Sequence, residues 1–286
     1  MKEHILVTGC SGFIGSAIVK NLLDAGYIVS SVSRNSNKSK SSFSIDLTAS
    51  SEVYEFIKKS KPIDVVIHCA AIAHGETPPK SYTVSEFNSA MINNLVSAFS
   101  EKQPHWIFLS SISVYGDSYF KSPIPMEELP LPSDSYGQGK LCDEHSLIKA
   151  CNHLDILRLM PVYDSYENKD IKKRIFIPKT GIKLRILPSP LYSFCHIHVL
   201  IEKVVGCLGQ TSRLRLHQVG NHLPTSQEDL IKAFPGPSFT IPQIFFKFLL
   251  FLLPHKFGLF RRIRFMIKKL GLSNTYELGV RELKKY

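Results

Sequence analysis

The sequence predicts an α/β protein built on a doubly wound parallel sheet, with a smaller C-terminal lobe. Over roughly the first 160 residues, short apolar runs alternate with longer stretches in which apolar residues recur at helical spacing. This alternation is typical of parallel strands joined by right-handed crossover helices. After Tyr163 the alternation ends, and prolines divide the chain into short pieces. We therefore expect a sheet domain over 1–163, to which 191–207 returns, and a lobe made of 164–190 and 208–286.

Apolar periodicity gives the expected elements in order. In the first helix, for example, Ile14, Ile18 and Leu22 are spaced as on one helical face. The predicted strands are Ile5–Thr8, Ile28–Val32, Val65–Cys69, Trp106–Ser110 and Leu154–Leu159. The predicted helices are Gly15–Ala25, Ser51–Lys59, Ser85–Glu101 and Ser135–Ala150.

A glycine-rich turn joins the first strand to the first helix. Gly9 would permit a tight turn, Gly12 would let a pyrophosphate approach the backbone, and Gly15 would let the helix pack on the strand. The N-terminus of the helix would offer N–H groups and a positive dipole end to the phosphates. The motif predicts a dinucleotide site, although a glycine-rich turn without a ligand is the alternative. The other predicted cofactor contacts in this turn are Ser11, Phe13 and Ile14.

A tyrosine and a lysine about 120 residues downstream predict a proton-transfer site. Tyr136 and Lys140 are four residues apart at the start of a predicted helix, so both side chains face the same way. A nearby ammonium and a positively charged nicotinamide ring would favour the phenolate, lowering the tyrosine pKa toward the working range. A surface pair without a catalytic role is the alternative.

Several motifs, in this order, resemble the extended short-chain dehydrogenase/reductases, in the branch that holds nucleotide-sugar epimerases and 4-ketoreductases. The resemblance runs from residue 4 to about residue 205. It implies a Rossmann fold, a bound NAD or NADP and a nucleotide-sugar substrate. Besides the glycine and Tyr-Lys motifs, it is carried by Asp46-Leu47, His68-Cys69-Ala70-Ala71, Asn88, Ser110–Gly116 and His196-Ile197-His198-Val199.

The resemblance also implies residue roles. Ser111 would hold the reacting oxygen of the substrate, and Lys140 would hold the nicotinamide ribose as well as tune Tyr136. Asn88 would be a buried structural amide. The remaining cofactor contacts would be Asp46 and Leu47 at the adenine edge, with Ala70, Ala71 and Ile72 beneath the ribose and phosphates.

The end of the second strand bears on cofactor choice. NAD-dependent members place an acidic residue there to bind the ribose hydroxyls. Here the position is Ser33, followed by Arg34 and Asn35. A small residue beside an arginine suits a 2′-phosphate, so NADP is the preferred prediction and NAD the alternative.

The substrate site is less defined by the sequence. Ile112 and Ser113 stand where family dehydratases carry an acidic pair, which argues against dehydration. Ser113, Pro161 and His196 are the candidate substrate contacts. Pro161 replaces a residue with an N–H, so the sugar phosphates would need other partners. These partners, unless they form a solvated surface, would be Lys172, Lys173, Arg174, Lys179, Lys183 or Arg185.

We expect an oxidoreductase acting at C4 of a nucleotide-linked sugar. The specific prediction is reduction of a UDP-4-keto-6-deoxy-N-acetylhexosamine in surface polysaccharide synthesis. A UDP-sugar 4-epimerase with tightly bound NAD is one alternative, and a non-catalytic NADP-sensing regulatory protein is another. The sequence does not determine the oligomeric state, and a homodimer is one alternative.

The charge and the cysteine content limit which metals, partners and cellular locations we expect. The six cysteines suggest neither a disulfide framework nor a zinc site, and if Cys195–His198 is a strand its side chains alternate between faces. We expect no metal, no nucleic-acid partner and a cytoplasmic location. The segment from Ile241 to Tyr286 has ten Lys and Arg against two Glu, so it carries +8 of the net +11. Contact of 244–270 with a membrane surface is open, and a helix packed in the lobe followed by a solvated basic helix is preferred.

Overall fold

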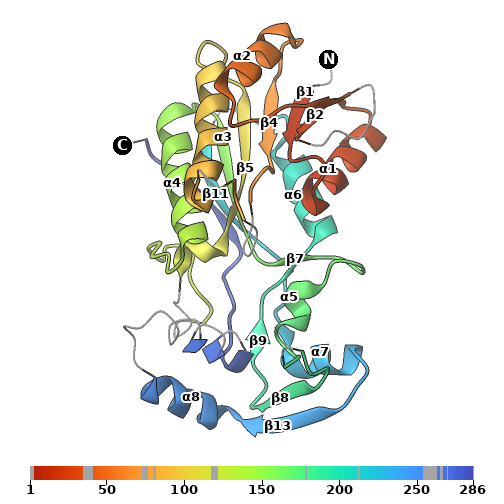
Figure 1. The fold of residues 1–286 in the computed structure, drawn as a ribbon, viewed down its shortest axis with the longest axis vertical. Coiled ribbons are helices and arrows are strands. Elements are labelled where there is room, and N and C mark those ends of the chain that lie inside the picture. The colour runs from red at the N-terminus through yellow and green to blue at the C-terminus, as the bar shows by residue number, and fades with distance from the viewer. Residues whose placement is uncertain are drawn as a thin grey trace.

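The computed structural model is centred on a mostly parallel sheet of eight strands (Figure 1). Its strands lie in the order β14-β11-β6-β5-β4-β1-β2-β3, and only β14 is antiparallel to its neighbour among the described strands of this sheet. They are β1 (His4–Thr8), β2 (Ile28–Ser33), β3 (Ser42–Ser44), β4 (Val65–His68), β5 (His105–Ser111), β6 (Leu154–Leu159), β11 (Leu214–Val219) and β14 (Gly279–Glu282). The structure describes residues 3–34, 41–72, 77–79, 82–116, 122–177, 179–210, 213–253, 263–264, 267–268 and 270–285.

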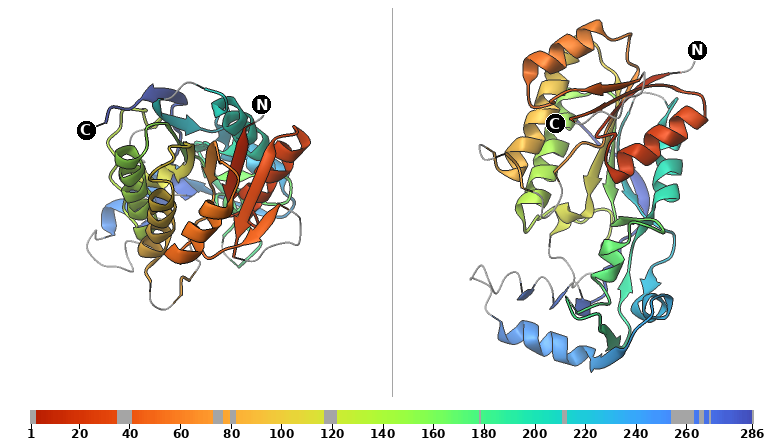
Figure 2. Two further views of the ribbon diagram at one scale, coloured as in Figure 1. Left: turned by 90° about the horizontal axis from the view of Figure 1, so that it is seen from above. Right: turned by 45° about the vertical axis from the view of Figure 1, so that its right-hand side comes forward.

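Helices cover both faces of this sheet, which explains why its strands are apolar along their whole length. One face packs against α1 (Phe13–Asp24) and α6 (Ile197–Cys207). The other packs against α2 (Ser50–Lys59), α3 (Val84–Ala98) and α4 (Ser135–Ala150). Figure 2 shows the three layers from above. The predicted doubly wound α/β fold is confirmed, and the five predicted strands and four predicted helices are present with ends shifted by at most a few residues.

Two further strands of the sheet come from 208–286, the range that the sequence analysis assigned to the lobe. β11 pairs with β6, and β14 pairs with β11. The sequence pattern conceals β11 because His217 and Gln218 interrupt its apolar run, although both are buried. The central sheet therefore takes these strands from the lobe range.

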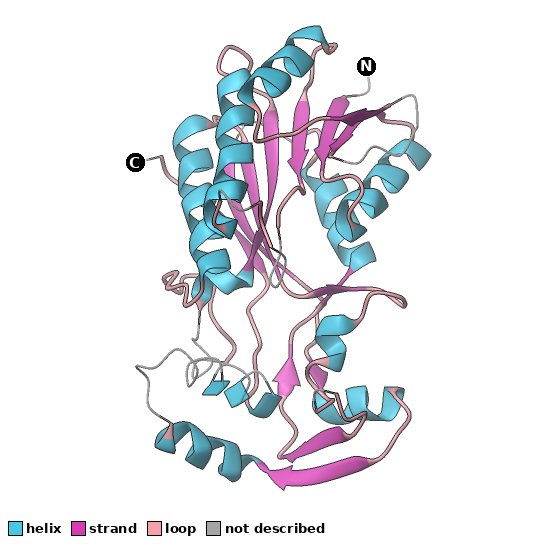
Figure 3. Cartoon of the chain, viewed as in Figure 1, coloured by secondary structure: helices cyan, strands magenta, loops and turns pink. Residues whose placement is uncertain are grey.

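The C-terminal lobe lies below the carboxyl end of the sheet in Figure 1, where the parallel strands terminate (helices and strands are distinguished in Figure 3). It is built from short elements around two apolar clusters. These elements are β7 (Val162–Tyr163), α5 (Lys169–Lys172), β8 (Lys183–Leu187), β9 (Leu191–Tyr192), β10 (Cys195–His196), β12 (Thr225–Ser226), α7 (Gln227–Ala233), β13 (Ser238–Pro242) and α8 (Gln243–Leu252). Among the residues that the structure describes, no helix has the length and apolar character needed to cross a bilayer.

Candidate active site

The turn between β1 and α1 is shaped by two glycines. Gly9 has φ +70°, a left-handed conformation that glycine adopts without strain. A Cβ on Gly15 would lie 2.2 Å from the carbonyl oxygen of Gly9, so only glycine permits this contact between helix and turn. No side chain caps the helix at Gly12, so backbone N–H groups at this end are available to an anion. Ser11 and Gly12 are exposed here, whereas Phe13 and Ile14 are half-buried.

The glycine turn lies at the point where the sheet changes direction. β1 lies between β2 and β4, and a Cβ on Gly9 would lie 2.7 Å from the backbone nitrogen of Ala70. The Ala70 N–H donates to Thr8 Oγ1 at 3.2 Å, which joins the two strand ends. Such a switch point is where doubly wound sheets bind dinucleotides. Ala71 and Ile72 continue from it, as expected for a pocket floor.

Asn88 holds this floor in place. Its Oδ1 accepts from the Ile72 N–H at 2.8 Å, and its Nδ2 donates to the Ile72 carbonyl at 3.2 Å. Asn88 is buried on α3, and both backbone polar groups of Ile72 are satisfied by this one amide. The structural role predicted for Asn88 fits this geometry.

The predicted adenosine-binding residues lie around the ends of β2 and β3. Ser33 is buried at the end of β2 and lines a cavity of about 300 Å³ together with Cys10 and Ser11. Arg34 is exposed, with its guanidinium carbon 5.4 Å from the centroid of the Phe87 ring. Asn35 lies outside the described residues.

Asp46 and Leu47 follow β3. One carboxylate oxygen of Asp46, Oδ1, already accepts from the N–H and hydroxyl of Thr48 at 2.9 and 2.7 Å. Leu47 is buried, and its carbonyl accepts from Asn94 Nδ2 at 3.0 Å. The backbone here is thus fixed from two sides, and an adenine would meet a preformed surface.

Ser111 ends β5 and begins a short 3₁₀ helix, η1 (Ile112–Tyr115). Its Oγ accepts from the Ser113 N–H at 3.1 Å and donates to Ser113 Oγ at 3.0 Å. Both serines are half-buried. A pair of hydroxyls therefore lies at the carboxyl end of the sheet, and the Ser111 hydroxyl is oriented by the turn that follows it.

Tyr136 and Lys140 lie in the first turns of α4, which Asp134 caps by accepting from the Gly137 N–H at 2.8 Å. The Lys140 ammonium is buried, donates to the Leu109 carbonyl at 2.8 Å, and lies 6.0 Å from the centroid of the Tyr136 ring. The structure thus brings the ammonium beneath the tyrosine, as the four-residue spacing predicts. Because Leu109 is on β5, two residues before Ser111, the same contact joins α4 to the strand that carries the serine.

The pKa of Tyr136 differs from the expectation. Burial, together with the carboxylates of Asp134 and Asp143, raises it to about 12. The sequence argument expected Lys140 and a cofactor charge to lower this pKa. That expectation includes a bound nicotinamide, whereas in the protein alone burial has the largest effect and raises the pKa of Tyr136; burial also lowers the pKa of Lys140. Without cofactor, Tyr136 is firmly protonated at neutral pH.

The sequence analysis missed a buried ion pair beneath this site. Glu144 and Arg158 form a two-point pair, with Nε to Oε1 at 3.0 Å and Nη2 to Oε2 at 2.7 Å. Ser110 donates to Glu144 at 2.5 Å, and Arg158 donates to Tyr115 Oη at 2.8 Å. The network fixes α4 against β5 and β6. A signal was present, because Glu144 lies four residues after Lys140 on the same helical face.

Asp143 is a second acidic residue on α4 that the sequence analysis did not consider. It is buried, its Oδ1 accepts from Ser89 Oγ at 2.6 Å, and burial raises its pKa to about 6. Its charge raises the pKa of the Lys140 ammonium against the larger effect of burial.

The candidate substrate contacts Pro161 and His196 lie where the lobe meets the sheet. The Pro161 carbonyl accepts from the Cys195 N–H at 3.0 Å. The His196 ring packs edge-on against Tyr163, with centroids 5.1 Å apart, and the backbone N–H of His196 donates to Asn221 Oδ1 at 2.8 Å. The strand expected over Cys195–His198 ends at His196, because α6 begins at Ile197 and His196 Nδ1 caps it by accepting from the His198 N–H.

Part of the basic set proposed for the sugar phosphates has other partners. Lys183 is buried and donates to the carbonyls of Ile231 and Phe234, at 3.1 and 2.7 Å, where α7 ends. Arg174 is buried over the Tyr192 ring. Lys183 and Arg174 therefore have structural roles in the lobe. In the same set, Arg185 pairs with Glu228 at 3.0 Å, Lys173 pairs with Asp170 at 3.0 Å, Lys172 lies over the Phe234 ring, and Lys179 is exposed.

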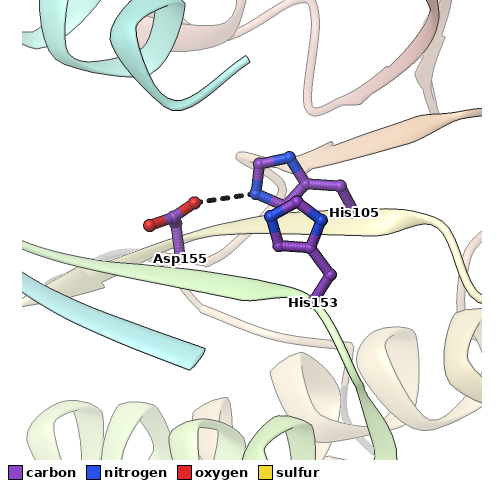
Figure 4. Close-up of side chains that lie close together, drawn as sticks. All are labelled: His105, His153 and Asp155. Atoms are coloured by element: carbon purple, nitrogen blue, oxygen red, sulfur yellow. Dashed lines mark hydrogen bonds and ion pairs between the residues drawn. The ribbon is translucent and has the colours of Figure 1, made fainter. Parts of the chain in front are cut away.

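A second cluster of titratable residues lies at the opposite, amino end of the sheet (Figure 4). The Asp155 carboxylate accepts from His105 Nε2 at 2.7 Å, from His217 Nε2 at 2.5 Å and from two nitrogens of Arg215, each at 2.7 Å. Two overlapping triads here, His105–His153–Asp155 and Asp155–Cys207–His217, each have potential ligand atoms within 4.8 Å of one another.

Two features of the cluster argue against metal binding. The rings of His105 and His153 are stacked, 3.6 Å between centroids and 5° from parallel, so their in-plane lone pairs cannot converge on one ion. Arg215 already neutralises the carboxylate of Asp155 with a two-point hydrogen bond. The cluster therefore contains one carboxylate–guanidinium ion pair, between Asp155 and Arg215, to which two imidazoles are hydrogen-bonded.

Comparison with known proteins places this geometry in a family. A model of the NAD dependent epimerase/dehydratase family matches residues 5–181, more than half of the chain. A UDP-glucose 4-epimerase of Vibrio cholerae is 26% identical over 259 residues, covering 85% of this chain and 79% of that protein.

Solved structures share the fold at lower identity. The Bordetella bronchiseptica enzyme WbmH in complex with NAD+ has a TM-score of 0.70 at 16% identity, covering 97% of this chain and 89% of that one. A dTDP-4-dehydrorhamnose reductase from Yersinia enterocolitica has a TM-score of 0.63 at 22% identity, covering 86% of each chain. The chain belongs to the NAD-dependent epimerase/dehydratase family, and is an NAD(P)-dependent enzyme of the extended short-chain dehydrogenase/reductase type.

Proposed function

We propose that this enzyme reduces the 4-keto group of a nucleotide-linked sugar, a UDP-4-keto-6-deoxy-N-acetylhexosamine, with NADPH, for surface polysaccharide synthesis. The observation that supports the proposal is the arrangement at the carboxyl end of the sheet, where the Tyr136 phenol, whose pKa is raised to about 12, lies beside the buried Lys140 ammonium. Ketone reduction needs a proton for the oxygen, and a phenol with this pKa holds its proton until the oxygen demands it. A reduced nicotinamide ring is uncharged, so it adds no charge that would lower this pKa.

The residues around Tyr136 suit a transfer of its proton to the sugar oxygen. In this proposal the hydroxyls of Ser111 and Tyr136 bind that oxygen and orient it. The phenol then gives up its proton, and the buried Lys140 ammonium, 6.0 Å from the ring centroid, stabilises the phenolate that remains. Because the Leu109 carbonyl holds Lys140, the ammonium stays in place through the reaction.

The cofactor fits the glycine turn, which leaves no room for a Cβ at Gly9 or Gly15. When bound, the nicotinamide supplies the hydride. Gly12 and the first amides of α1 would bind the pyrophosphate, and Ser33 and Arg34 would bind the 2′-phosphate that distinguishes NADPH from NADH. A phosphate would compete well for the Arg34 guanidinium, since a charge-assisted pair is stronger than the exposed contact with Phe87.

A second candidate function is 4-epimerisation of a UDP-sugar with NAD retained. The UDP-glucose 4-epimerase relative, which aligns over most of both chains, favours it. The two candidates share Ser111, Tyr136 and Lys140 and differ in how the cofactor is used. A reductase consumes one NADPH per turnover, whereas an epimerase returns the hydride to the same carbon.

Cofactor consumption therefore tests the proposal. The purified enzyme, mixed with a UDP-4-keto-6-deoxy-N-acetylhexosamine and NADPH, should oxidise one NADPH per sugar reduced, measured by nicotinamide absorbance and product chromatography. Tyr136→Phe is the control for enzyme-dependent loss of NADPH. Interconversion of UDP-sugars without added cofactor, with no NADPH consumed by the keto sugar, would replace the reductase with the epimerase.

A further inference from the structure

Helix α8 has apolar side chains on two opposite sides, but the described residues cover only one of these sides. Phe246 and Leu250, one turn apart, are buried against an apolar cluster of the lobe that includes Ile186. Five other large apolar side chains of α8 have exposed fractions between 50% and 84%. These are Ile244, Phe245, Phe248, Phe251 and Leu252.

The five exposed side chains form one continuous surface, which we call the apolar face of α8. At about 100° per residue, they fall within an arc of about 120°, while Phe246 and Leu250 point the opposite way. Lys247 is exposed at the border of this arc. One apolar side of α8 packs in the protein and a second is exposed to solvent. An exposed apolar surface of this kind is typical of an interaction site.

Contacts at both ends hold α8 with this face outward. The Arg264 guanidinium is buried and donates to the carbonyls of Leu250 and Leu253, which satisfies the C-terminal end of the helix. Gln243, its first residue, donates from Nε2 to the Gly271 carbonyl at 3.0 Å. The preceding strand, β13, pairs with β8 over five residues. The apolar face is therefore a fixed surface.

The charge of this region indicates the chemistry of the partner. From Gln243 to Leu272 the sequence has seven Lys and Arg and no Asp or Glu. Four of these residues lie outside the described residues: Lys256, Arg261, Arg262 and Lys269. Arg264 and Lys268 are described and are buried, so these two side chains differ from the solvated basic helix that the sequence predicted. A second copy of the chain would oppose like charge with like charge, whereas an anionic surface would be attracted.

We propose that the apolar face of α8 docks onto the surface of an anionic lipid bilayer. At about 1.5 Å per residue, the ten residues of α8 are far shorter than a bilayer core, so the helix would lie in the interfacial plane. The aromatic and aliphatic side chains of the apolar face enter the headgroup region, Lys247 at its border binds an anionic headgroup, and the net positive charge of 243–272 attracts the protein to the anionic surface. Because α8 is at the far end of the lobe in Figure 1, the lobe would face the bilayer and the central sheet would point away from it.

Vesicle binding by the full chain tests this proposal. The protein should co-sediment with phosphatidylcholine vesicles that contain phosphatidylglycerol, more weakly with phosphatidylcholine alone, and less in high salt. Phe248→Glu should weaken this binding at least about tenfold, since it removes an aromatic side chain that the bilayer would bury and adds a negative charge that anionic headgroups repel. Tyr54→Glu is the matched control, because Tyr54 and Phe248 are both 56% exposed and α2 lies at the opposite end of the molecule.

A spectroscopic reporter keeps the test independent of sedimentation. The single natural tryptophan, Trp106, is buried in the sheet. Phe251→Trp should therefore add an emission that shifts to the blue with anionic vesicles. Equal binding by the wild type and Phe248→Glu, or no binding by the wild type, would overturn the proposal. So would a dimer that Phe248→Glu dissociates in the absence of lipid, measured by light scattering, because a second copy would then be the occupant of the apolar face.

Discussion

The two ends of the central sheet both bury charged side chains, but in different ways. At the amino end, the charge of the Asp155 carboxylate is balanced by the Arg215 guanidinium, and two histidines add hydrogen bonds to the same carboxylate. At the carboxyl end, the Lys140 ammonium has a carbonyl for its partner, and Tyr136 above it is protonated. The difference teaches that burial of charge does not identify a site by itself. A better indication of a site is a buried charge that is only partly compensated and lies beside a group that can release a proton.

A third group of buried charges, the Glu144–Arg158 ion pair, lies beneath the site at the carboxyl end of the sheet. Its carboxylate and guanidinium are paired with each other by two hydrogen bonds, and the pair fixes the helix that carries Tyr136 and Lys140. A buried ion pair therefore supports the helix from below, and the residues proposed for proton transfer, Tyr136 and Lys140, lie above it.

The largest expected effect comes from Tyr136→Phe. If the carboxyl end carries the chemistry, loss of the hydroxyl should reduce turnover by about a thousandfold, equivalent to about 4 kcal/mol, because the proton donor is gone. NADPH binding, followed by fluorescence titration, should be nearly unchanged. A variant with close to normal turnover would refute the role of Tyr136.

The next effect is on stability, at the other end of the sheet. Asp155→Asn removes the charge that balances the largely buried Arg215 and should lower the free energy of unfolding by about 3 kcal/mol, measured in urea. Turnover per folded molecule should not change. The control is Glu282→Gln, whose exposed ion pair with Arg213 should contribute less than about 1 kcal/mol. Loss of activity without loss of stability in Asp155→Asn would mean that the amino end takes part in the chemistry.

A pH dependence separates the two ends further. Burial lowers the pKa of His68 to about 3, whereas a histidine in the unfolded chain has a pKa near 6.5. As pH falls through this window, the unfolded state binds a proton that the folded state lacks, so stability should fall by about 1.4 kcal/mol per pH unit. Asp143 acts in the opposite sense below about pH 6, because its pKa is raised to about 6.

The measurement is therefore a difference between variants. Urea unfolding at about pH 7 and about pH 5 should show a shallower loss of stability with acid for His68→Gln than for the wild type. Gln keeps an oxygen that can accept from the Thr8 hydroxyl, which bonds His68 Nδ1 at 2.9 Å. His153→Gln at the amino end should give a similar change over this interval, because burial lowers the pKa of His153 to about 4, and the two variants should diverge only below that pH. Parallel pH profiles for the wild type and His68→Gln would contradict the expectation.

The smallest expected effect concerns cofactor choice. NADPH should bind more tightly than NADH by roughly 1–2 kcal/mol, and Arg34→Ala should remove most of this preference, because the exposed guanidinium provides the charge for the 2′-phosphate. Dissociation constants for both nucleotides measure it, and Lys58→Ala on the exposed side of α2, which does not line the cavity beside Ser33, serves as a control for general charge. Tighter binding of NADH by the wild type would assign NAD to this site.

Local sequence patterns predicted much of this architecture. Each of the first strands carries its own apolar run, and the glycine turn and the Tyr136–Lys140 spacing are contained within single elements. β11 was not predicted, because its burial is decided by the neighbouring strand β6, and its polar residues are paired only in three dimensions. The same reason hid Asp155, whose partners are 50–62 residues away in the sequence.

The sign of the Tyr136 pKa shift was also out of reach of the sequence. Spacing shows that an ammonium is near the phenol, but not that the Leu109 carbonyl engages it or that burial is deep enough to dominate. The sequence shows that the α8 segment is apolar, but it does not show which side of the helix the lobe covers.

The path of the chain between sheet and lobe has a consequence for modularity. The chain leaves the sheet after β6, returns with α6 and β11, leaves again, and returns with β14. The lobe is therefore two insertions into one sheet, and no single cut releases it as a contiguous cassette. Exchange of the lobe between relatives would require two simultaneous grafts with matched ends, so changes in specificity are more accessible through substitutions within the lobe than through recombination.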